Sequence, residues 1–383
     1  MKESKGLIVL VSQYRFPEGD AGSVRFYNFA LSLQRLGYKI LVVGLGEVTD
    51  GEQEFQGVSY LSLRTPNRYG SYLFYTWRLK KVLTRLKKGR GNIEAIVCGF
   101  TMIDVLLFLK SYCRRHGIKL IKDVVEWYSP QQFKRGKMSY AYQMKDIENR
   151  VLVAPPVRVI AISRYLERYF ISRGCVTGRI PIYFDVAKLP LRVGADDGIL
   201  RLVYAGSPGK KDYLCLMLEG LLLLTSSQRV QVRFTIVGVS ESQIQMMLSP
   251  LKYKMLESVL DIRGRIPHAE VLNVLCHVDF SVLLRDAEAR YAQAGFPTKV
   301  IESLGVGLPV ICNYSSDLAD FLVDQENAMI VKSLSTEAFA ETLTRALSLT
   351  QIEKEKMSVK ARRCAESRFN IDSYDESWRM VLS

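Results

Sequence analysis

The amino-acid sequence predicts an α/β protein with two doubly wound domains, each built on a parallel sheet. Short apolar runs rich in β-branched residues alternate with longer stretches of helical period, which is typical of strands joined by crossover helices. The same alternation begins again at Leu200. The length of 383 residues also exceeds the roughly 150 residues of an average domain, so the chain has room for two cores.

In the first half we expect five strands and two clear helices. The helices are expected over 21–36 and 101–116, and the strands over 6–11, 39–44, 94–99, 119–125 and 157–163. The stretch 181–198 is rich in Pro, Gly and Asp without a clear period, which is typical of a linker. We therefore assign an N-terminal domain to residues 1–185, a linker to 186–199 and a C-terminal domain to 200–370.

The second half repeats the pattern, and its last segment has two possible places. Strands are expected over 200–207, 232–239, 259–265, 279–285 and 307–313. Segment 371–383 carries Tyr374, Trp378 and Val381 on one face of a helix. Such a helix could close the second domain or cross back onto the first, and its period leaves both possibilities open.

Composition excludes several classes of protein. With 48% apolar and 24% charged residues, the chain is neither disordered nor fibrous. No run reaches the roughly 18 apolar residues of a membrane span, and the run 7–11 is too short for the core of a signal peptide. The seven cysteines are scattered without a CxxC pair, the three histidines lack ligand spacing, and no DxD triplet occurs. We expect a cytoplasmic protein with no metal and no cofactor.

Charge is distributed unevenly along the chain. Residues 1–185 contain 13 Lys and 17 Arg against 15 acidic residues, a net charge of +15, whereas residues 186–383 carry a net charge of −1. Such asymmetry indicates that the first domain meets an anionic partner, which could be a membrane surface, a nucleic acid or a phosphorylated substrate.

Two glycine-bearing turns follow predicted strands and precede predicted helices. Gly19 and Gly22 lie in the first turn, and Gly206 opens the second, ahead of Lys210 and Lys211. Free amides and lysines at a helix N-terminus can bind a diphosphate without metal. Each turn taken alone is also compatible with an ordinary strand–helix connection or a solvated pair of lysines.

Two later turns have related features. Arg265 and Ile266 precede a helix expected after Pro267, so their backbone groups are free to hydrogen-bond a flat base. Stretch 295–299 breaks the chain before another helix, and its amides can point at an anion. Glu302 follows about one turn inside that helix, where its carboxylate could accept both hydroxyls of a ribose.

These four turns, in this order and spacing, resemble the retaining GT-B glycosyltransferases of family 4, the group 1 glycosyl transferases. The stretches 162–170 and 204–212 add to the resemblance, which covers nearly the whole chain. It implies two Rossmann-like domains that face a central cleft, with the C-terminal helix crossing back to domain one. It also implies a nucleotide-sugar donor bound mainly by the second domain.

The resemblance assigns roles to individual residues of this sequence. Lys211 is implied to bind the donor diphosphate, Arg265 and Ile266 to frame the base, and Glu302 to contact the ribose. The full implied donor-binding set is Gly19, Gly22, Gly206, Ser207, Lys210, Lys211, Arg265, Ile266, Gly295, Phe296, Pro297, Thr298, Lys299 and Glu302.

The chain departs from the family pattern at two positions. Ala294 stands where the first glutamate of the Glu-x7-Glu motif is expected, and Ser207 replaces the usual arginine in a loop one residue shorter. We expect Arg285 to supply the missing positive charge and, with Lys211, to stabilise the leaving group. We interpret Ala294 as subgroup variation; the alternative is a donor-binding protein that has lost activity.

In the first domain we nominate Asp123 and Glu126, at a strand end, as carboxylates that orient acceptor or sugar hydroxyls; a structural strand-end cap is the alternative. Segment 68–90 interleaves aromatic residues with eight Lys or Arg, which on a helix favours an anionic membrane surface. A solvated basic helix with an aromatic core side remains the plainer interpretation.

The function predicted from the sequence is retaining, metal-independent glycosyl transfer from a UDP- or GDP-sugar to a glycan or lipid-linked acceptor. We expect a role in cell-surface polysaccharide biosynthesis, at the inner face of the cytoplasmic membrane and without nucleic acid. The alternatives are an inactive nucleotide-sugar-binding protein and a GT-B nucleotide-sugar epimerase, although no convincing internal acid and base are found for epimerisation.

Overall fold

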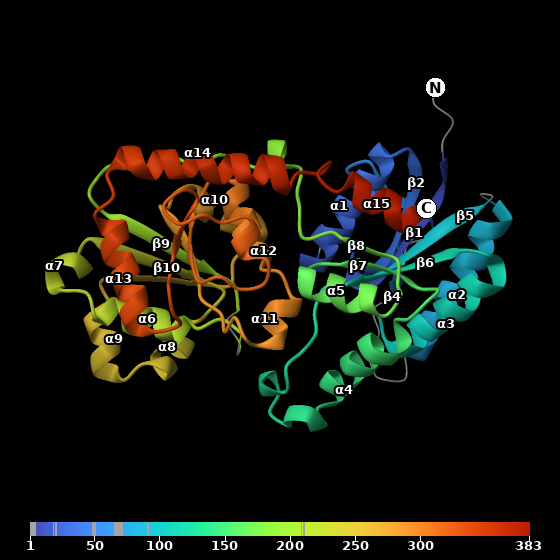
Figure 1. Ribbon diagram of the computed structural model, residues 1–383, viewed down its shortest axis with the longest axis horizontal. Coiled ribbons are helices and arrows are strands. Elements are labelled where there is room, and N and C mark those ends of the chain that lie inside the picture. The colour runs from blue at the N-terminus through green and yellow to red at the C-terminus, as the bar shows by residue number, and fades with distance from the viewer. Residues whose placement is uncertain are drawn as a thin grey trace. The chain divides into compact units, whose positions relative to one another are not determined.

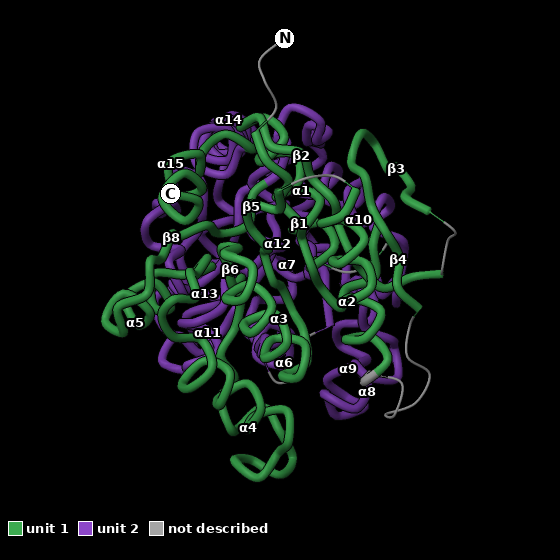
Figure 2. The backbone as a smooth tube through the Cα atoms, turned by 90° about the vertical axis from the view of Figure 1, so that its right-hand side faces the viewer, with its two compact units in different colours: residues 1–183, 371–383 green, residues 184–370 purple. Residues whose placement is uncertain are grey.

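The computed structural model describes residues 5–17, 19, 21–47, 51–64, 72–89, 92–207, 209 and 211–383. The chain divides into two compact units, Met1–Tyr183 with Ile371–Ser383 (unit 1) and Phe184–Asn370 (unit 2), coloured separately in Figure 2. Each unit has its own sheet, and helices pack around the sheet of each unit (Figure 1). The predicted fold class, two doubly wound α/β units, is confirmed.

The sheet of unit 1 has the order β3-β4-β2-β1-β5-β6-β7-β8 in the described residues, and all neighbours are parallel except β3 and β4. Strand β1 is central, and the chain continues to β2 on one side and returns to β5 on the other. The strands are β1 Lys5–Arg15, β2 Tyr38–Gly46, β3 Gln53–Phe55, β4 Val58–Arg64, β5 Ile93–Cys98, β6 Lys119–Val124, β7 Arg158–Ala161 and β8 Thr177–Arg179.

Helices of unit 1 form where an apolar face recurs at helical spacing. In α1, for example, Phe26, Phe29, Ala30 and Leu33 are all buried. The helices are α1 Ala21–Arg35, α2 Tyr72–Gly89, α3 Ile103–His116, α4 Tyr140–Ile147, α5 Arg164–Ser172 and α15 Asp375–Leu382. A π-helical turn, Glu148–Leu152, continues α4.

The sheet of unit 2 is parallel throughout, in the order β11-β10-β9-β12-β13-β14. Its strands are β9 Leu200–Ala205, β10 Val232–Val237, β11 Leu260–Gly264, β12 Phe280–Leu283, β13 Val310–Cys312 and β14 Ala328–Ile330. Its helices are α6 Leu214–Leu222, α7 Ser226–Arg229, α8 Glu241–Met247, α9 Pro250–Leu256, α10 His268–Cys276, α11 Arg290–Ala294, α12 Thr298–Gly305, α13 Thr336–Leu347 and α14 Gln351–Arg368. Strands β9 and β12 are neighbours from which the chain leaves in opposite directions, which is the switch point where such sheets bind ligands.

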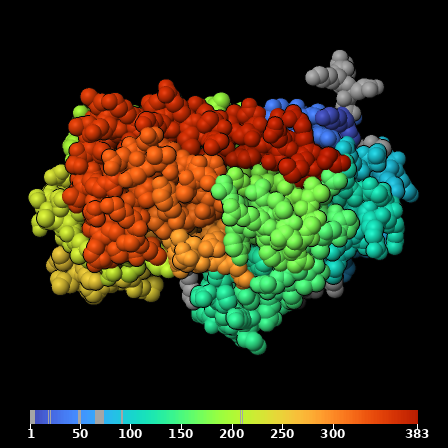
Figure 3. Space-filling view, viewed as in Figure 1, coloured from blue at the N-terminus to red at the C-terminus, as the bar shows by residue number. Residues whose placement is uncertain are grey.

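The C-terminal helix α15 belongs to unit 1, as the resemblance implied. Trp378 is fully buried, and its ring meets that of Phe29 edge-on at 4.8 Å between centroids. The Ser377 hydroxyl donates to the carbonyl of Arg179 at the end of β8, 3.1 Å away. Figure 3 shows the red C-terminal atoms lying beside the green segment that contains α5 and β8.

The segment predicted as a linker, 186–199, lies in unit 2, because the boundary between the two units falls between Tyr183 and Phe184 in the chain. Its Arg192 donates to the carboxylate of Asp279 at 2.6 Å, and both side chains are only 2% exposed. This buried ion pair holds the segment around Arg192 against unit 2.

We expect Trp378→Ala to lower the free energy of unfolding by about 3–5 kcal/mol, because it removes a large side chain from the core of unit 1. Chemical denaturation followed by far-UV circular dichroism measures the change. Met380→Ala is the matched control, since Met380 lies on the same helix but is 50% exposed. Equal effects of the two substitutions would contradict the docking of α15.

Candidate functional site in unit 2

A buried carboxylate holds together the loops that follow β9 and β12. Asp212 accepts a hydrogen bond from Arg285 Nε at 2.8 Å on one oxygen and from Lys299 Nζ at 2.7 Å on the other. The hydroxyl of Tyr204 donates to the second oxygen as well, at 2.8 Å. The Asp212 side chain is only 3% exposed, whereas those of Arg285 and Lys299 are 14% and 21% exposed. We call Asp212, Arg285 and Lys299 the Asp212 cluster.

Electrostatics keep the Asp212 cluster charged. Burial by itself raises the pKa of the Asp212 carboxyl, but Lys299 and Arg285 outweigh that effect and lower it. Burial also disfavours the charged form of Lys299 and so lowers the pKa of its ammonium, whereas the Asp212 carboxylate raises this pKa. One carboxylate and two cations leave one excess positive charge at the carboxyl edge of the sheet.

Further hydrogen bonds fix the backbone around the cluster. Asn313 accepts from the Arg285 amide at 2.9 Å and donates to the Arg285 carbonyl at 2.7 Å. The Tyr291 hydroxyl donates to the Lys211 carbonyl at 3.0 Å, and the Tyr213 amide donates to the Leu284 carbonyl at the same distance. The loop that carries Lys211 is therefore bound to α11 and to the segment that follows β12 and contains Arg285.

Gly206 allows the cluster to approach the end of β9. It has a φ of +141°, a conformation that side chains rarely adopt, and a Cβ there would lie 2.7 Å from Lys299 Nζ. Ser207 follows it, while Lys210 lies outside the described residues. Helix α6 begins at Leu214, and Asp212, two residues before it, forms a backbone bridge with Arg285.

The turn before α12 has the predicted form. Helix α12 starts at Thr298, directly after Pro297, so the amides of Thr298 and Lys299 lie in its first turn. The side chain of Phe296 is turned into the core beside Phe321, and the Ser316 hydroxyl donates to the Gly295 carbonyl at 2.5 Å. Only the backbone of Phe296 therefore remains for a ligand.

Glu302 has a partner that the sequence did not suggest. Its Oε1 lies 3.1 Å from Nε2 of His268, at the start of α10. This hydrogen bond raises the pKa of the imidazole, because the carboxylate stabilises the protonated ring. The turn between β11 and α10 contains Arg265 and Ile266, whose amides donate no hydrogen bond to other described residues.

In unit 1 the structure gives Asp123 a role different from the one predicted. Its two oxygens accept from Arg25 Nε at 3.0 Å and Nη2 at 2.8 Å, and the two side chains are 1% and 4% exposed. Arg25 also donates to the carbonyls of Ile180 and Pro181. Asp123 is therefore enclosed in a buried ion pair, which favours a structural role such as the strand-end cap weighed above.

Glu126 lies at the same edge of the sheet. It is partly exposed and accepts a hydrogen bond from the Tyr128 hydroxyl at 2.6 Å.

Gly19 and Gly22 permit close packing of the first turn: a Cβ on Gly22 would overlap the ring of Tyr14, and one on Gly19 would overlap Ser23.

Helix α2 covers most of the basic, aromatic segment 68–90, whose residues 68–71 and 90 lie outside the described part. Tyr75 is buried, whereas Phe74 and Trp77 are 61% and 52% exposed. The ammonium of Lys81 lies 3.5 Å from the centre of the Trp77 ring. The helix thus has an aromatic core side and also two exposed aromatic rings beside cations.

Residues 200–348 match the sequence profile of the family Glycosyl transferases group 1. This match lies within unit 2 and confirms the resemblance to the group 1 glycosyl transferases there. No curated protein sequence matches the chain.

Solved structures of similar fold span the whole chain. Sucrose-phosphate synthase from Thermosynechococcus elongatus superposes with a TM-score of 0.72 at 14% identity, covering 98% of both chains. WaaG, a glycosyltransferase involved in lipopolysaccharide biosynthesis, gives 0.66 at 14% identity and 98% of both chains. Anabaena HepE in complex with UDP-glucose gives 0.66 at 13% identity and 97% of both chains. The chain has the GT-B fold of these proteins.

No group of three or more His, Cys, Asp or Glu side chains in the described ranges is arranged to hold a metal ion. Within those same ranges, none of the helices combines the length and the apolar character needed to span a bilayer.

We expect Asp212→Ala to lower the free energy of unfolding by about 3 kcal/mol, because two partly buried cations lose their counter-ion. The Asp212 pKa is lowered by folding, so its contribution is complete above its unfolded pKa of about 4 and is lost as the pH falls through the folded value. Wild-type stability should therefore decrease below about pH 4 more steeply than that of the variant.

Denaturant titrations over a pH series measure both effects. Asp197→Ala is the control, since the Asp197–Arg201 ion pair is exposed and should contribute little. A variant as stable as the wild type would show that the Asp212 cluster is not coupled to folding.

Proposed function

We propose that the protein transfers a sugar from a nucleotide-diphosphate donor to an acceptor hydroxyl with retention of anomeric configuration. The observation that carries the proposal is the Asp212 cluster, which places two cations beside the amides of the α12 N-terminus at the switch point of unit 2. This combination suits a diphosphate, because cations and oriented amides both stabilise its negative charge.

In the proposed reaction the bond between C1 of the sugar and the diphosphate oxygen breaks as the acceptor oxygen bonds to C1. The acceptor proton passes to the departing diphosphate, so no enzymic nucleophile is required. Lys211, Arg285 and the amides of residues 295–298 would stabilise the leaving group as its charge develops. No metal has a part in this mechanism, and transfer should therefore continue in EDTA.

Several neighbours support a nucleotide-sugar donor. HepE has been solved with UDP and with UDP-glucose, and the catalytic domain of starch synthase IV from Arabidopsis thaliana with ADP and acarbose. For this chain we propose a UDP- or GDP-sugar, with Glu302 at the ribose and the turn of Arg265 and Ile266 at the base.

Unit 1 is proposed to bind the acceptor, with Glu126 oriented toward its hydroxyls. The net charge of +15 over residues 1–185 and the exposed rings of α2 favour a glycan or lipid-linked acceptor at an anionic membrane surface. A role in cell-surface polysaccharide synthesis at the inner face of the cytoplasmic membrane follows from this choice of acceptor.

A second candidate function rests on Ala294. Its methyl group is fully buried at the end of α11, so the first carboxylate of the family motif has no counterpart here. A protein that binds the donor without transferring it would fit this position.

We expect Lys211→Ala to reduce turnover by about 100-fold or more, because a cation no longer stabilises the leaving diphosphate. Release of UDP or GDP from a panel of donors measures turnover, with and without EDTA. Lys254→Ala is the control, since Lys254 is exposed on α9. Donor binding without turnover in the wild type would favour the inactive alternative, and unchanged turnover of the variant would remove Lys211 from the mechanism.

We expect the double variant Phe74→Ser, Trp77→Ser to bind vesicles containing phosphatidylserine about tenfold more weakly, since two exposed rings no longer insert. Vesicle flotation measures the binding. Leu223→Ser, at a residue of unit 2 that is 53% exposed, is the control. Wild-type protein that shows no preference for anionic over zwitterionic vesicles would contradict the membrane proposal.

A further inference from the structure

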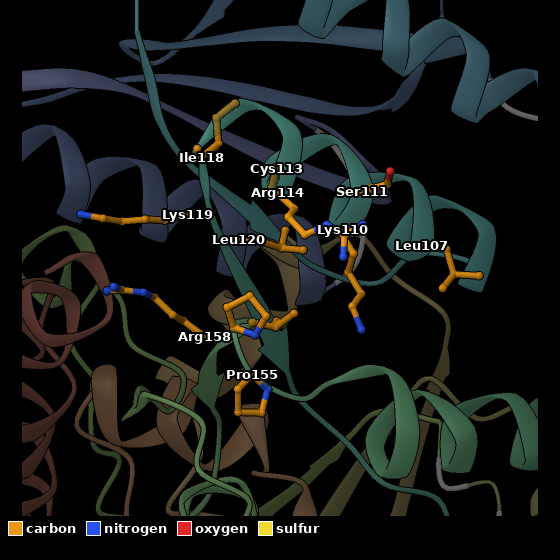
Figure 4. A pocket seen from close by; sticks show the side chains of 13 residues that line it. Leu107, Lys110, Ser111, Cys113, Arg114, Ile118, Lys119, Leu120, Pro155 and Arg158 are labelled. Carbon is orange, nitrogen blue, oxygen red and sulfur yellow. The ribbon is translucent and has the colours of Figure 1, made fainter.

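Unit 1 contains a cavity at the edge of its sheet opposite to the carboxyl ends of the strands. It lies where β6 and β7 begin, between α3 and the turn Pro155–Arg158 (Figure 4), and its volume is about 570 Å³. This volume falls in the range of small-molecule sites. Doubly wound sheets bind their substrates at the carboxyl edge, so the cavity is separate from the proposed donor and acceptor regions.

One face of α3 forms a wall of this cavity. Leu107, Lys110, Ser111 and Arg114 all line it, and their spacing of three and four residues places them on the same side of the helix. Lys110 and Arg114 are one turn apart, and Figure 4 shows their side chains close together in the middle of the view. The wall thus combines two cations and a hydroxyl with an apolar side chain.

Four cations line the cavity, and three of them have backbone partners. Lys119 and Arg158 donate to the carbonyls of Leu382 and Val381, and so hold the end of α15. Lys110 donates to the carbonyl of Leu152 at 2.6 Å. Arg114 makes no hydrogen bond or ion pair with any described residue, and neither Lys110 nor Arg158 has a carboxylate partner among them.

The chemistry of the lining restricts the ligand. None of the thirteen lining residues is acidic, and Ser111 is the single side chain among them that offers a neutral oxygen acceptor. Sugar hydroxyls need acceptors as well as donors, so a neutral sugar is a poor fit. No lining residue is aromatic, so a nucleobase would have no ring on which to stack. Lys119 has a carboxylate nearby, Glu94 at 3.8 Å, whereas Arg114 has no partner among the described residues. An anion rich in acceptor oxygens therefore fits the wall that carries Arg114 and Lys110.

The remaining surface of the cavity is apolar. Leu107, Ile118, Leu120, Pro155 and Pro156 line it together with the cations. A bare inorganic ion would leave this surface in contact with water, whereas a ligand that carries an apolar group beside its anion would cover it.

We propose that this cavity is a binding site for a phosphate group that carries an apolar substituent, with Arg114 as the bidentate ligand of the phosphate and Lys110 beside it. A guanidinium matches the geometry of phosphate oxygens, and its charge here is uncompensated by any described carboxylate. The phosphate could belong to a lipid headgroup or to a soluble phosphate ester. The proposal does not depend on donor binding in unit 2.

The test is isothermal titration of the intact protein with three probes: monomeric dihexanoyl phosphatidic acid, dihexanoyl phosphatidylcholine and glucose 6-phosphate. We expect phosphatidic acid to bind and Arg114→Gln to weaken it by about tenfold or more, as for a lost charge-assisted contact. Arg115→Gln is the matched control, because Arg115 is exposed on the last turn of the same helix and does not line the cavity. A second variant, Leu107→Asn, should weaken phosphatidic acid and leave glucose 6-phosphate unchanged.

Preference for phosphatidic acid over both other probes, lost in Arg114→Gln and kept in Arg115→Gln, would establish a lipid phosphate as the source. Equal binding of glucose 6-phosphate with the same dependence on Arg114 would support the phosphate site, assign it to a soluble ester and overturn the apolar substituent. Absence of binding by all probes, or equal losses in the Arg114 and Arg115 variants, would overturn the proposal. Thermal shift by the nucleotide donor, measured on the same variants, reports the proposed function separately.

Discussion

The arrangement of unit 2 depends on the desolvated carboxylate of Asp212. Removing this group from water is costly, and the cost is offset only when Arg285, Lys299 and Tyr204 all reach it. These partners come from three different elements, since Tyr204 lies on β9, Arg285 follows β12 and Lys299 lies in the first turn of α12. The Asp212 carboxylate thereby fixes the loops at the switch point and orients the two cations there. Such preorganisation is what a site for a developing anion requires.

Unit 1 uses the same device at a different place. The Arg25–Asp123 pair is buried, and the guanidinium also binds two carbonyls of the chain just after β8. Nearby, Lys122 on β6 and Lys145 on α4 both contact Glu148, at 3.4 and 2.8 Å, at the start of the π-helical turn. Apolar residues could stabilise these positions as well, but they would not fix the direction of the chain through directional hydrogen bonds.

The sequence predicted ten of the fourteen strands in the described residues, the turns and the class of fold, because apolar period and glycine position are local signals; it missed the short strands β3, β8 and β14 and the strand β4. The turn before α12, for instance, follows from Gly295 and Pro297 alone. Partners of charged groups depend on sheet order instead: Asp212 and Arg285 are 73 residues apart, and only the neighbouring positions of β9 and β12 bring them together. The ion pair of Asp123 could not be predicted for the same reason. Its partner Arg25 lies 98 residues earlier, and nothing near Asp123 in the sequence reveals it. Lys299 was predicted as a ligand residue, but its bond to Asp212 had no local signal.

The pair formed by His268 and Glu302 shows how the proposed ribose contact differs from a simple carboxylate. One oxygen of Glu302 faces His268 Nε2 at 3.1 Å, so one acceptor position of the carboxylate is engaged by His268 and the others remain for two hydroxyls. The His268 side chain is 55% exposed and the Glu302 side chain 16%, so the imidazole can turn into water at little cost. With the buried methyl of Ala294 in place of the other family carboxylate, Glu302 is the acidic group left in this motif, so under the proposed function His268 and the donor ribose would share one carboxylate. Protonation of His268 strengthens its hydrogen bond to Glu302, so the pair that orients this carboxylate also sets how readily it is released.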